Sequence, residues 1–168
     1  MVVIGCEGAS EVYLMNKLLE QNLLIFSKKE ILDRRPIHFR QPKEIAPLID
    51  ILPIEEKIII YRIGDTQNDE YNLKCFNARL ENITTVKVCT KPEIEILIII
   101  NEGHFDDYSK VKSKMSPKQY VKVKLPECNN IQLYFANHDM VFAINEYKRL
   151  KQNNKNELFL ADLLKQQE

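Results

Sequence analysis

Apolar residues recur along the chain in short runs, and most of these runs lead into a helical pattern. The run at 57–63 is almost continuously apolar and β-branched, as is typical of a central parallel strand that is covered on both faces. Shorter runs at 2–6, 36–40 and 84–89 predict three further strands. We therefore expect a sheet of four strands.

Amphipathic patterns between and after these runs predict helices. In residues 11–22, apolar side chains such as Leu14, Leu18 and Leu19 recur at helical spacing, and polar residues separate them. We expect this helix to pack on the sheet. Further helices are predicted at 42–52, at 71–80, at 105–111, at 133–150 with an interruption near 137–139, and at 158–164.

The run at 94–100 allows two interpretations. Its β-branched residues would suit a strand. However, Thr90 and Glu93 have the spacing of a capping box, Pro92 would stand in the first turn, and Gly103 closes the segment. We therefore expect a helix that is apolar on most sides and buried, with a strand as the alternative.

The alternation of strands with helices predicts an α/β fold. We expect a single Rossmann-like domain whose largely parallel, four-stranded sheet is flanked by helices. The core should span about 1–103, and a helical C-terminal part should span about 104–168. A length of 168 residues suits one domain with a sizeable core.

Composition restricts the function classes. Lys and Arg together number 24, as do Asp and Glu, so no global positive field recruits nucleic acid. Any such binding must come from a local patch, and the best candidate is 110–124, which contains several lysines and no acid.

The four cysteines form no C-x-x-C pair and predict reduced thiols. The chain shows no signal peptide and no membrane-spanning run, so we expect a cytoplasmic protein.

Acidic residues follow the first predicted strand. Glu7 ends the run, Gly8 would provide a tight turn, and Ser10 would be the N-cap of the following helix. Glu11 would then lie in the first helical turn, near Glu7. In the simplest alternative, Glu7 is an ordinary strand-end acid and Glu11 complements the helix dipole.

A second group of acids follows the third predicted strand. The run at 57–63 leads into Asp65, Asp69 and Glu70, and Asp69 is also a possible N-cap for the helix at 71–80. In a parallel sheet the carboxyl ends of the first and third strands can meet at one edge. We therefore expect the acids of both groups to face each other.

Such a cluster predicts a divalent metal site. Carboxylate oxygens are the ligands that Mg²⁺ or Mn²⁺ prefers, and an ion held there can assist the cleavage of a phosphodiester bond. Carboxylates this close to one another also repel, unless some are protonated or a cation neutralises them. Both arguments favour a cation at this edge of the sheet.

These motifs resemble a known family. The sequence Glu7-Gly8-x-x-Glu11-x-Tyr13 is similar to the opening motif of Toprim-like nucleases, most closely those of the RloB and AbiL type linked to phage defence. That family has an Asp-x-Asp pair after a later strand, whereas here Gln67 stands between Asp65 and Asp69. The sequence 91–95 also looks like a block that precedes a buried helix in RloB-like proteins. The resemblance covers roughly 2–103.

The resemblance implies a Mg²⁺- or Mn²⁺-dependent nuclease that hydrolyses RNA or DNA in defence against phage, and it implies a partner ATPase. It implies Glu7 as metal ligand or general base, and Asp65 and Asp69 as catalytic metal ligands. Glu70 would be a further ligand. The supporting acids would be Glu11 and Glu93, with Glu95 as an alternative to Glu93, and the residues that hold substrate phosphates would be Lys91, Lys112, Lys114 and Lys118.

Two other hypotheses remain open. A non-catalytic interaction or regulatory subunit with the same architecture is favoured by Gln67 and by the neutral net charge. A nucleotide-binding α/β protein is disfavoured, because the chain has only four glycines and no glycine-rich phosphate-binding motif. The apolar late helices would permit a homodimer.

Overall fold

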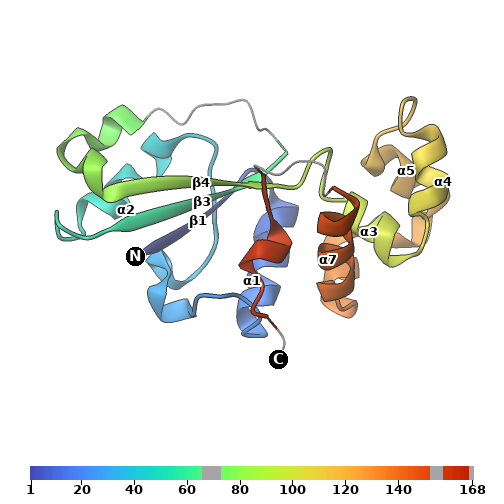
Figure 1. Cartoon of the computed structure of the whole chain (residues 1–168), viewed down its shortest axis with the longest axis horizontal. Helices are drawn as coiled ribbons and strands as arrows, with labels where there is room; N and C mark the ends of the chain where they lie inside the picture. The colour runs from blue at the N-terminus through green and yellow to red at the C-terminus, as the bar shows by residue number, and fades with distance from the viewer. Residues whose placement is uncertain (66–72, 152–156, 167–168) are drawn as a thin grey trace.

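Parallel strands form one sheet at the centre of the molecule (Figure 1). The structure is a computed structural model that describes residues 1–65, 73–151 and 157–166. All neighbouring strands run parallel, in the order β2-β1-β3-β4-β5. This confirms the predicted α/β class and adds a fifth strand. The strands are β1 (Val2–Cys6), β2 (Ile37–His38), β3 (Ile58–Gly64), β4 (Ile83–Cys89) and β5 (Leu158–Phe159).

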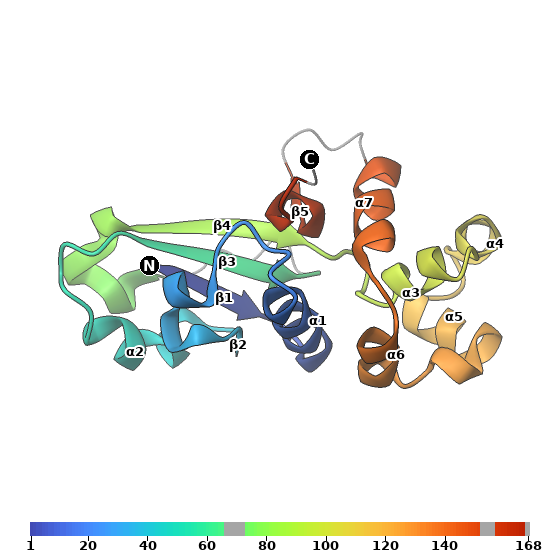
Figure 2. The ribbon, with the colours of Figure 1, turned by 90° about the horizontal axis from the view of Figure 1, so that it is seen from below.

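Helices cover the sheet and also form a separate group beside it (Figure 2). No helix in the described ranges is long and apolar enough to cross a membrane. The α-helices are α1 (Ala9–Glu20), α2 (Ala46–Asp50), α3 (Ile96–Asn101), α4 (Phe105–Val111), α5 (Pro117–Lys124), α6 (Ile131–Asn137) and α7 (Val141–Leu150). The 3-10 helices are η1 (Lys28–Glu30), η2 (Leu32–Arg34), η3 (Pro42–Glu44), η4 (Leu73–Asn82), η5 (Pro126–Cys128) and η6 (Leu160–Leu163).

Two hydrophobic cores lie on opposite faces of the sheet. Successive residues of a strand point to opposite faces, so Val3 and Ile60 belong to one core while Ile4 and Ile63 belong to the other. Helix α1 and the helices from α3 onward close the second core, and α2 and η4 close the first. The apolar run at 57–63 is therefore a central strand covered on both faces, as predicted, except at Ile59, which is 37% exposed.

The helical group packs around α3. Five consecutive residues of this helix, Ile96 to Ile100, are at most 4% exposed, so the segment at 94–100 is a buried helix and not a strand. Lys17 on α1 joins the sheet to this group. Its ammonium donates hydrogen bonds to the carbonyl groups of Phe135 and His138 at the end of α6, where a positive charge also complements the helix dipole.

Both N-cap predictions near the site were wrong. Gly8 takes the N-cap position of α1, and Ser10 lies inside the first turn. Thr90 and Glu93 form no capping box, because α3 begins only at Ile96. The Glu93 carboxylate instead accepts a hydrogen bond from the backbone N–H of Lys118 at 2.9 Å, so a long-range contact replaces the local one.

The end of the chain also differs from the expected helix at 158–164. Leu158 and Phe159 pair with Val88 and Cys89 at the edge of β4, and η6 follows. This pairing satisfies backbone groups at an otherwise open sheet edge, which a helix at the same place would leave unpaired. In the described part of the C-terminal region, helices predominate and residues 158–159 return to the sheet.

Candidate active site

The strand order reverses between β1 and β3, because β2 lies beyond β1 while β4 and β5 lie beyond β3. In open α/β sheets, ligands bind in the crevice that such a reversal creates at the carboxyl ends of the strands. Cys6 pairs with Ile63, so β1 and β3 end side by side. Glu7 and Asp65 follow these two ends, and the predicted convergence of the first and third strands is therefore confirmed.

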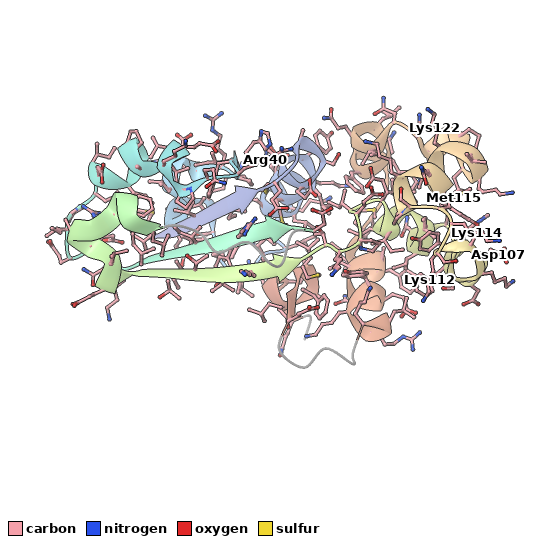
Figure 3. All side chains as sticks on the ribbon, turned by 90° about the horizontal axis from the view of Figure 1, so that it is seen from above. Arg40, Asp107, Lys112, Lys114, Met115 and Lys122 are labelled. Carbon is pink, nitrogen blue, oxygen red and sulfur yellow. The ribbon has the colours of Figure 1, made fainter. Side chains whose placement is uncertain are left out.

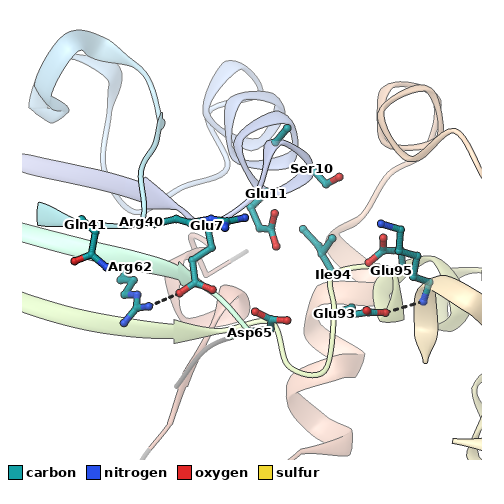
Figure 4. A pocket seen from close by; sticks show the side chains of 13 residues that line it. Glu7, Ser10, Glu11, Arg40, Gln41, Arg62, Asp65, Glu93, Ile94 and Glu95 are labelled. Atoms are coloured by element: carbon teal, nitrogen blue, oxygen red, sulfur yellow. Dashed lines mark hydrogen bonds and ion pairs between the residues drawn. The ribbon is translucent and has the colours of Figure 1, made fainter. Parts of the chain in front are cut away.

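An open cleft of about 540 Å³ lies at this point (Figure 4). We call it the acidic cleft. Its acids come from the end of β1, the first turn of α1, the end of β3 and the connection between β4 and α3. Arg40, Arg62 and Lys118 add positive charge to its lining. Among the described residues, the carboxylates that line the acidic cleft belong to Glu7, Glu11, Asp65, Glu93 and Glu95.

Arg62 and Glu7 form an ion pair at the base of the cleft. The distance from Arg62 Nη2 to Glu7 Oε1 is 2.6 Å, and the side chains are only 4% and 12% exposed. Arg62 stands opposite Gly5 in the β1–β3 register, two residues before Glu7, so both side chains project from the same face of the sheet. The pair compensates two charges that would be costly to bury alone.

The backbone of Glu7 is also fixed from both sides. Its N–H donates to the carbonyl of Ile63 at 3.0 Å, and its own carbonyl lies 3.0 Å from Nε2 of His38 on β2. Contacts with β2 and β3 therefore fix the backbone of Glu7, and the ion pair with Arg62 fixes its carboxylate.

Two glycines make room for the carboxylates. A Cβ atom added to Gly64 would lie 2.2 Å from the carboxylate carbon of Glu7, and one added to Gly8 would lie 2.4 Å from Oε2 of Glu11. The backbone of Gly8 is extended (φ −134°, ψ 162°), a conformation open to any residue, so the predicted tight turn is not its role. Gly8 and Gly64 instead let the two acids lie against bare backbone.

The acids of the cleft influence one another. Burial raises the pKa of Glu11, and the negative charges of Glu95, Asp65 and Glu7 raise it further. The pKa of Glu95 is also raised, chiefly by burial and then by neighbouring carboxylates, although Lys118 partly offsets this. Protonation or a bound cation would relieve this repulsion.

The oxygen donors of the cleft suit a hard divalent cation. The side chains of Glu7, Glu11 and Asp65 line the same cleft, in which the Glu7 carboxylate is turned toward Arg62 (Figure 4). Magnesium commonly uses one or two carboxylates and completes its coordination with water, so these donors are of the right kind. As the described side chains lie, no three His, Cys, Asp or Glu residues among them form a ready-made metal site. Asp69 and Glu70, both predicted ligands, lie outside the described residues, as does Gln67.

The structure divides the predicted lysines among three places. Lys118 lines the acidic cleft, whereas Lys112 and Lys114 line a neighbouring cavity. Lys91 lies in neither lining. Its carbonyl accepts a hydrogen bond from the hydroxyl of Tyr147, which ties α7 to the connection that carries Glu93 and Glu95.

Arg62 is the principal site residue that sequence reasoning missed. The available signal was a charged residue inside the otherwise apolar strand 57–63, since a buried arginine needs a partner. Arg40 and Gln41, which also line the cleft, carry no comparable signal, because both stand in a polar stretch after β2.

Comparisons with known protein families, with curated proteins and with solved structures find no match for this chain. The resemblance to Toprim-like nucleases, drawn from the motifs after the first and third strands, therefore stays a prediction.

Proposed function

We propose that the acidic cleft is the active site of a divalent-metal-dependent nuclease that hydrolyses phosphodiester bonds in RNA or DNA. The observation that carries the proposal is that Glu7, Glu11 and Asp65 line one cleft at the switch point of the sheet. The raised pKa of Glu11 supports it, because mutual repulsion among these acids gives a cation a reason to bind. The family resemblance adds a role in phage defence to the proposal.

Glu7, Glu11 and Asp65 would hold Mg²⁺ or Mn²⁺. A divalent ion there supplies charge neutralisation for the phosphate and lowers the pKa of a bound water. The other roles belong to the chain itself. Arg62 fixes the Glu7 carboxylate, and Arg40 and Lys118 supply positive charge for substrate phosphates.

Glu95 suits proton transfer. It is only 7% exposed and its raised pKa brings it closer to neutral pH, where a group can both accept and release a proton. We assign it the role of general acid for the leaving oxygen. This role was not among the sequence predictions, which treated Glu95 as an alternative to Glu93.

The direct test is cleavage of RNA, single-stranded DNA and duplex DNA with Mn²⁺, Mg²⁺ or EDTA. We expect metal-dependent cleavage by the wild type and a loss of at least about 100-fold in Asp65→Asn, the size of effect seen when one electrostatic stabiliser of a transition state is removed. The matched control is Asp106→Asn, because Asp106 is an exposed acid on α4 outside the cleft. Equal cleavage by the wild type and Asp65→Asn would contradict the proposal.

One observation favours a second function. Because Arg62 already pairs with Glu7, part of the negative charge of the cleft is neutralised without a metal. This favours a non-catalytic subunit whose cleft contacts a partner protein. Calorimetric titration with Mn²⁺ separates the two functions, since only the nuclease should bind the ion in a way that Asp65→Asn abolishes.

A further inference from the structure

A second cavity of about 460 Å³ lies next to the acidic cleft, between the start of α3 and helices α4 and α5. We call it the lysine-rimmed cavity. Its volume falls in the range of about 300–1,000 Å³ that is usual for sites of small ligands. Figure 3 shows Lys112, Lys114 and Met115 together at the end of the molecule formed by α4 and α5. The residues that carry the argument are Phe105, Tyr108, Met115, Lys112, Lys114 and Lys151.

The inner wall of this cavity is aromatic and apolar. Tyr108 is 5% exposed, and its ring packs edge to face on Tyr120 with centroids 5.4 Å apart and an interplanar angle of 78°. This contact fixes the orientation of the ring. Phe105 and Met115 are half-buried and complete a wall against which a flat, apolar group can pack.

The rim of the cavity is positive. Lys112, Lys114 and Lys151 line it, and Glu93 is the one acid in its described lining. Nearby, Lys110 forms a salt bridge with Asp107 at 2.8 Å. Within the described part of the chain, no salt bridge engages Lys112 or Lys114, and both are exposed, so their charges are available to an anion.

The two cavities share a wall. Glu93 lines both of them, and its carboxylate is held by the N–H of Lys118. Ser116 and Pro117 line the lysine-rimmed cavity, while the next residue, Lys118, lines the acidic cleft. A chain molecule that crosses this wall would place one of its units in each cavity.

We propose that the lysine-rimmed cavity receives an unstacked base of a single-stranded nucleic acid. The base would stack on Phe105, with the buried ring of Tyr108 behind it, and the phosphates beside it would contact Lys112, Lys114 and Lys151. Aromatic faces combined with a positive groove are how proteins hold single strands. A base inside a duplex is stacked and paired, so it would have to leave the helix to enter. The inference rests on the proposed function, because the same strand would then enter the acidic cleft.

The test is fluorescence anisotropy in EDTA with fluorescein-labelled RNA and DNA strands of equal length. The comparison strands are an abasic strand and a duplex. We expect the single strand to bind about 5- to 150-fold more tightly than the abasic strand, the range that corresponds to one base–aromatic stack. Phe105→Leu keeps apolar volume but loses the ring, so it should abolish this preference. Phe142→Leu is its matched control, because Phe142 is 64% exposed and lies outside both cavities.

A second pair of variants tests the rim. Lys112→Ala/Lys114→Ala should weaken the binding of normal and abasic strands alike. The fall of log affinity with log salt should also become less steep by about 1.4, as expected for two lost phosphate contacts. The control is Lys28→Ala/Lys29→Ala, which removes two exposed lysines of η1. Lys112 and Lys114 are exposed, so replacing them should leave the fold intact. This pair of variants therefore tests the cavity even if Phe105→Leu lowers the stability of the protein.

The outcomes separate this inference from the proposed function. Equal affinity for normal and abasic strands, or a duplex preference, would overturn the base site. An unchanged preference in folded Phe105→Leu would overturn it too. If binding behaves as expected but no metal supports cleavage, the nuclease proposal fails and the base site stands. If the protein cleaves nucleic acid but neither Phe105→Leu nor Lys112→Ala/Lys114→Ala changes the binding of single strands, only the base site fails.

Discussion

Arg62 Nη2 lies 2.6 Å from Glu7 Oε1, and this ion pair connects the interior of β3 with the end of β1. Both residues line the acidic cleft, but Arg62 is the more deeply buried, at 4% exposed against 12% for Glu7. Removing Arg62 would leave a poorly solvated carboxylate without its cation. The pair is therefore a feature on which both folding and the site depend.

The first prediction concerns this pair. Arg62→Ala should lower the free energy of unfolding by about 3–5 kcal/mol, the usual effect of breaking a buried ion pair from one side. Urea denaturation measures the change. The double variant Arg62→Met/Glu7→Gln should recover much of the loss, because it removes both charges. A loss below about 0.5 kcal/mol in Arg62→Ala, which is typical of surface substitutions, would show that the pair is not buried in solution.

The second prediction concerns the glycines. Gly64→Ala should destabilise the protein by about 1–3 kcal/mol, as overpacking does, and should weaken Mn²⁺ binding, because its Cβ would displace the pinned carboxylate of Glu7. Gly8→Ala is the matched comparison. Its Cβ would meet only the terminal oxygen of Glu11, which can rotate away, so the loss of stability should be smaller. Calorimetry gives both quantities, and equal effects of the two substitutions would contradict the prediction.

The third prediction concerns pH. Because the pKa values of Glu11 and Glu95 are raised in the folded protein, the folded state holds more protons than the unfolded state between the unfolded and folded pKa values. Stability therefore falls as pH rises through that window. Glu11→Gln and Glu95→Gln should each be more stable than the wild type at about pH 7, and this gain should vanish near pH 4, below the usual pKa of a glutamate. Thermal unfolding at several pH values measures it.

The control for this pH experiment has the opposite sign. Hydrogen bonds from the backbone N–H and the hydroxyl of Ser27 lower the pKa of Glu30. Its contribution to stability is present above the unfolded pKa and is lost as pH falls through the folded value. Glu30→Gln should therefore be less stable than the wild type at neutral pH. If all three substitutions shift stability in the same direction, the electrostatic account of the cleft is wrong.

The fourth prediction concerns Tyr147, which is 1% exposed and holds the carbonyl of Lys91. Tyr147→Phe should cost about 0.5–1.5 kcal/mol, because a part-buried carbonyl loses its donor, and it should also reduce cleavage by loosening the connection that carries Glu93 and Glu95. Tyr134→Phe is the matched control. Tyr134 is also buried and hydrogen-bonded, to Glu102 and Asn101, but it lies outside the cleft. A similar loss of stability with unchanged cleavage is expected there.

Much of the sheet and part of the site follow from sequence patterns alone. The apolar run at 57–63 identifies β3, and the acids after the first and third strands locate the acidic cleft, because parallel strands that end side by side bring Glu7 and Asp65 together. A continuous apolar run has one main physical cause, burial of a strand on both faces, so the strand can be predicted without a structure.

The remaining features depend on contacts between distant segments. Strand β5 is two residues long and exists because an edge of β4 is open, which no local pattern reveals. The spacing of Thr90 and Glu93 fits a capping box, yet the carboxylate binds the N–H of Lys118, 25 residues away in sequence. The same holds for Arg62, whose partner could be identified only from the β1–β3 register.

The pairing of β5 with β4 gives the chain an unexpected modular layout. The chain leaves the sheet after Cys89 and comes back at Leu158, and the last two residues of β4, Val88 and Cys89, pair with Leu158 and Phe159. The helices from α3 to α7 are thus an insertion whose two ends meet at one point of the sheet (Figure 2). Glu7, Glu11 and Asp65 belong to the framework, whereas the lysine-rimmed cavity belongs to the insertion. A change within the insertion could therefore alter the proposed base site while Glu7, Glu11 and Asp65 keep their places in the framework.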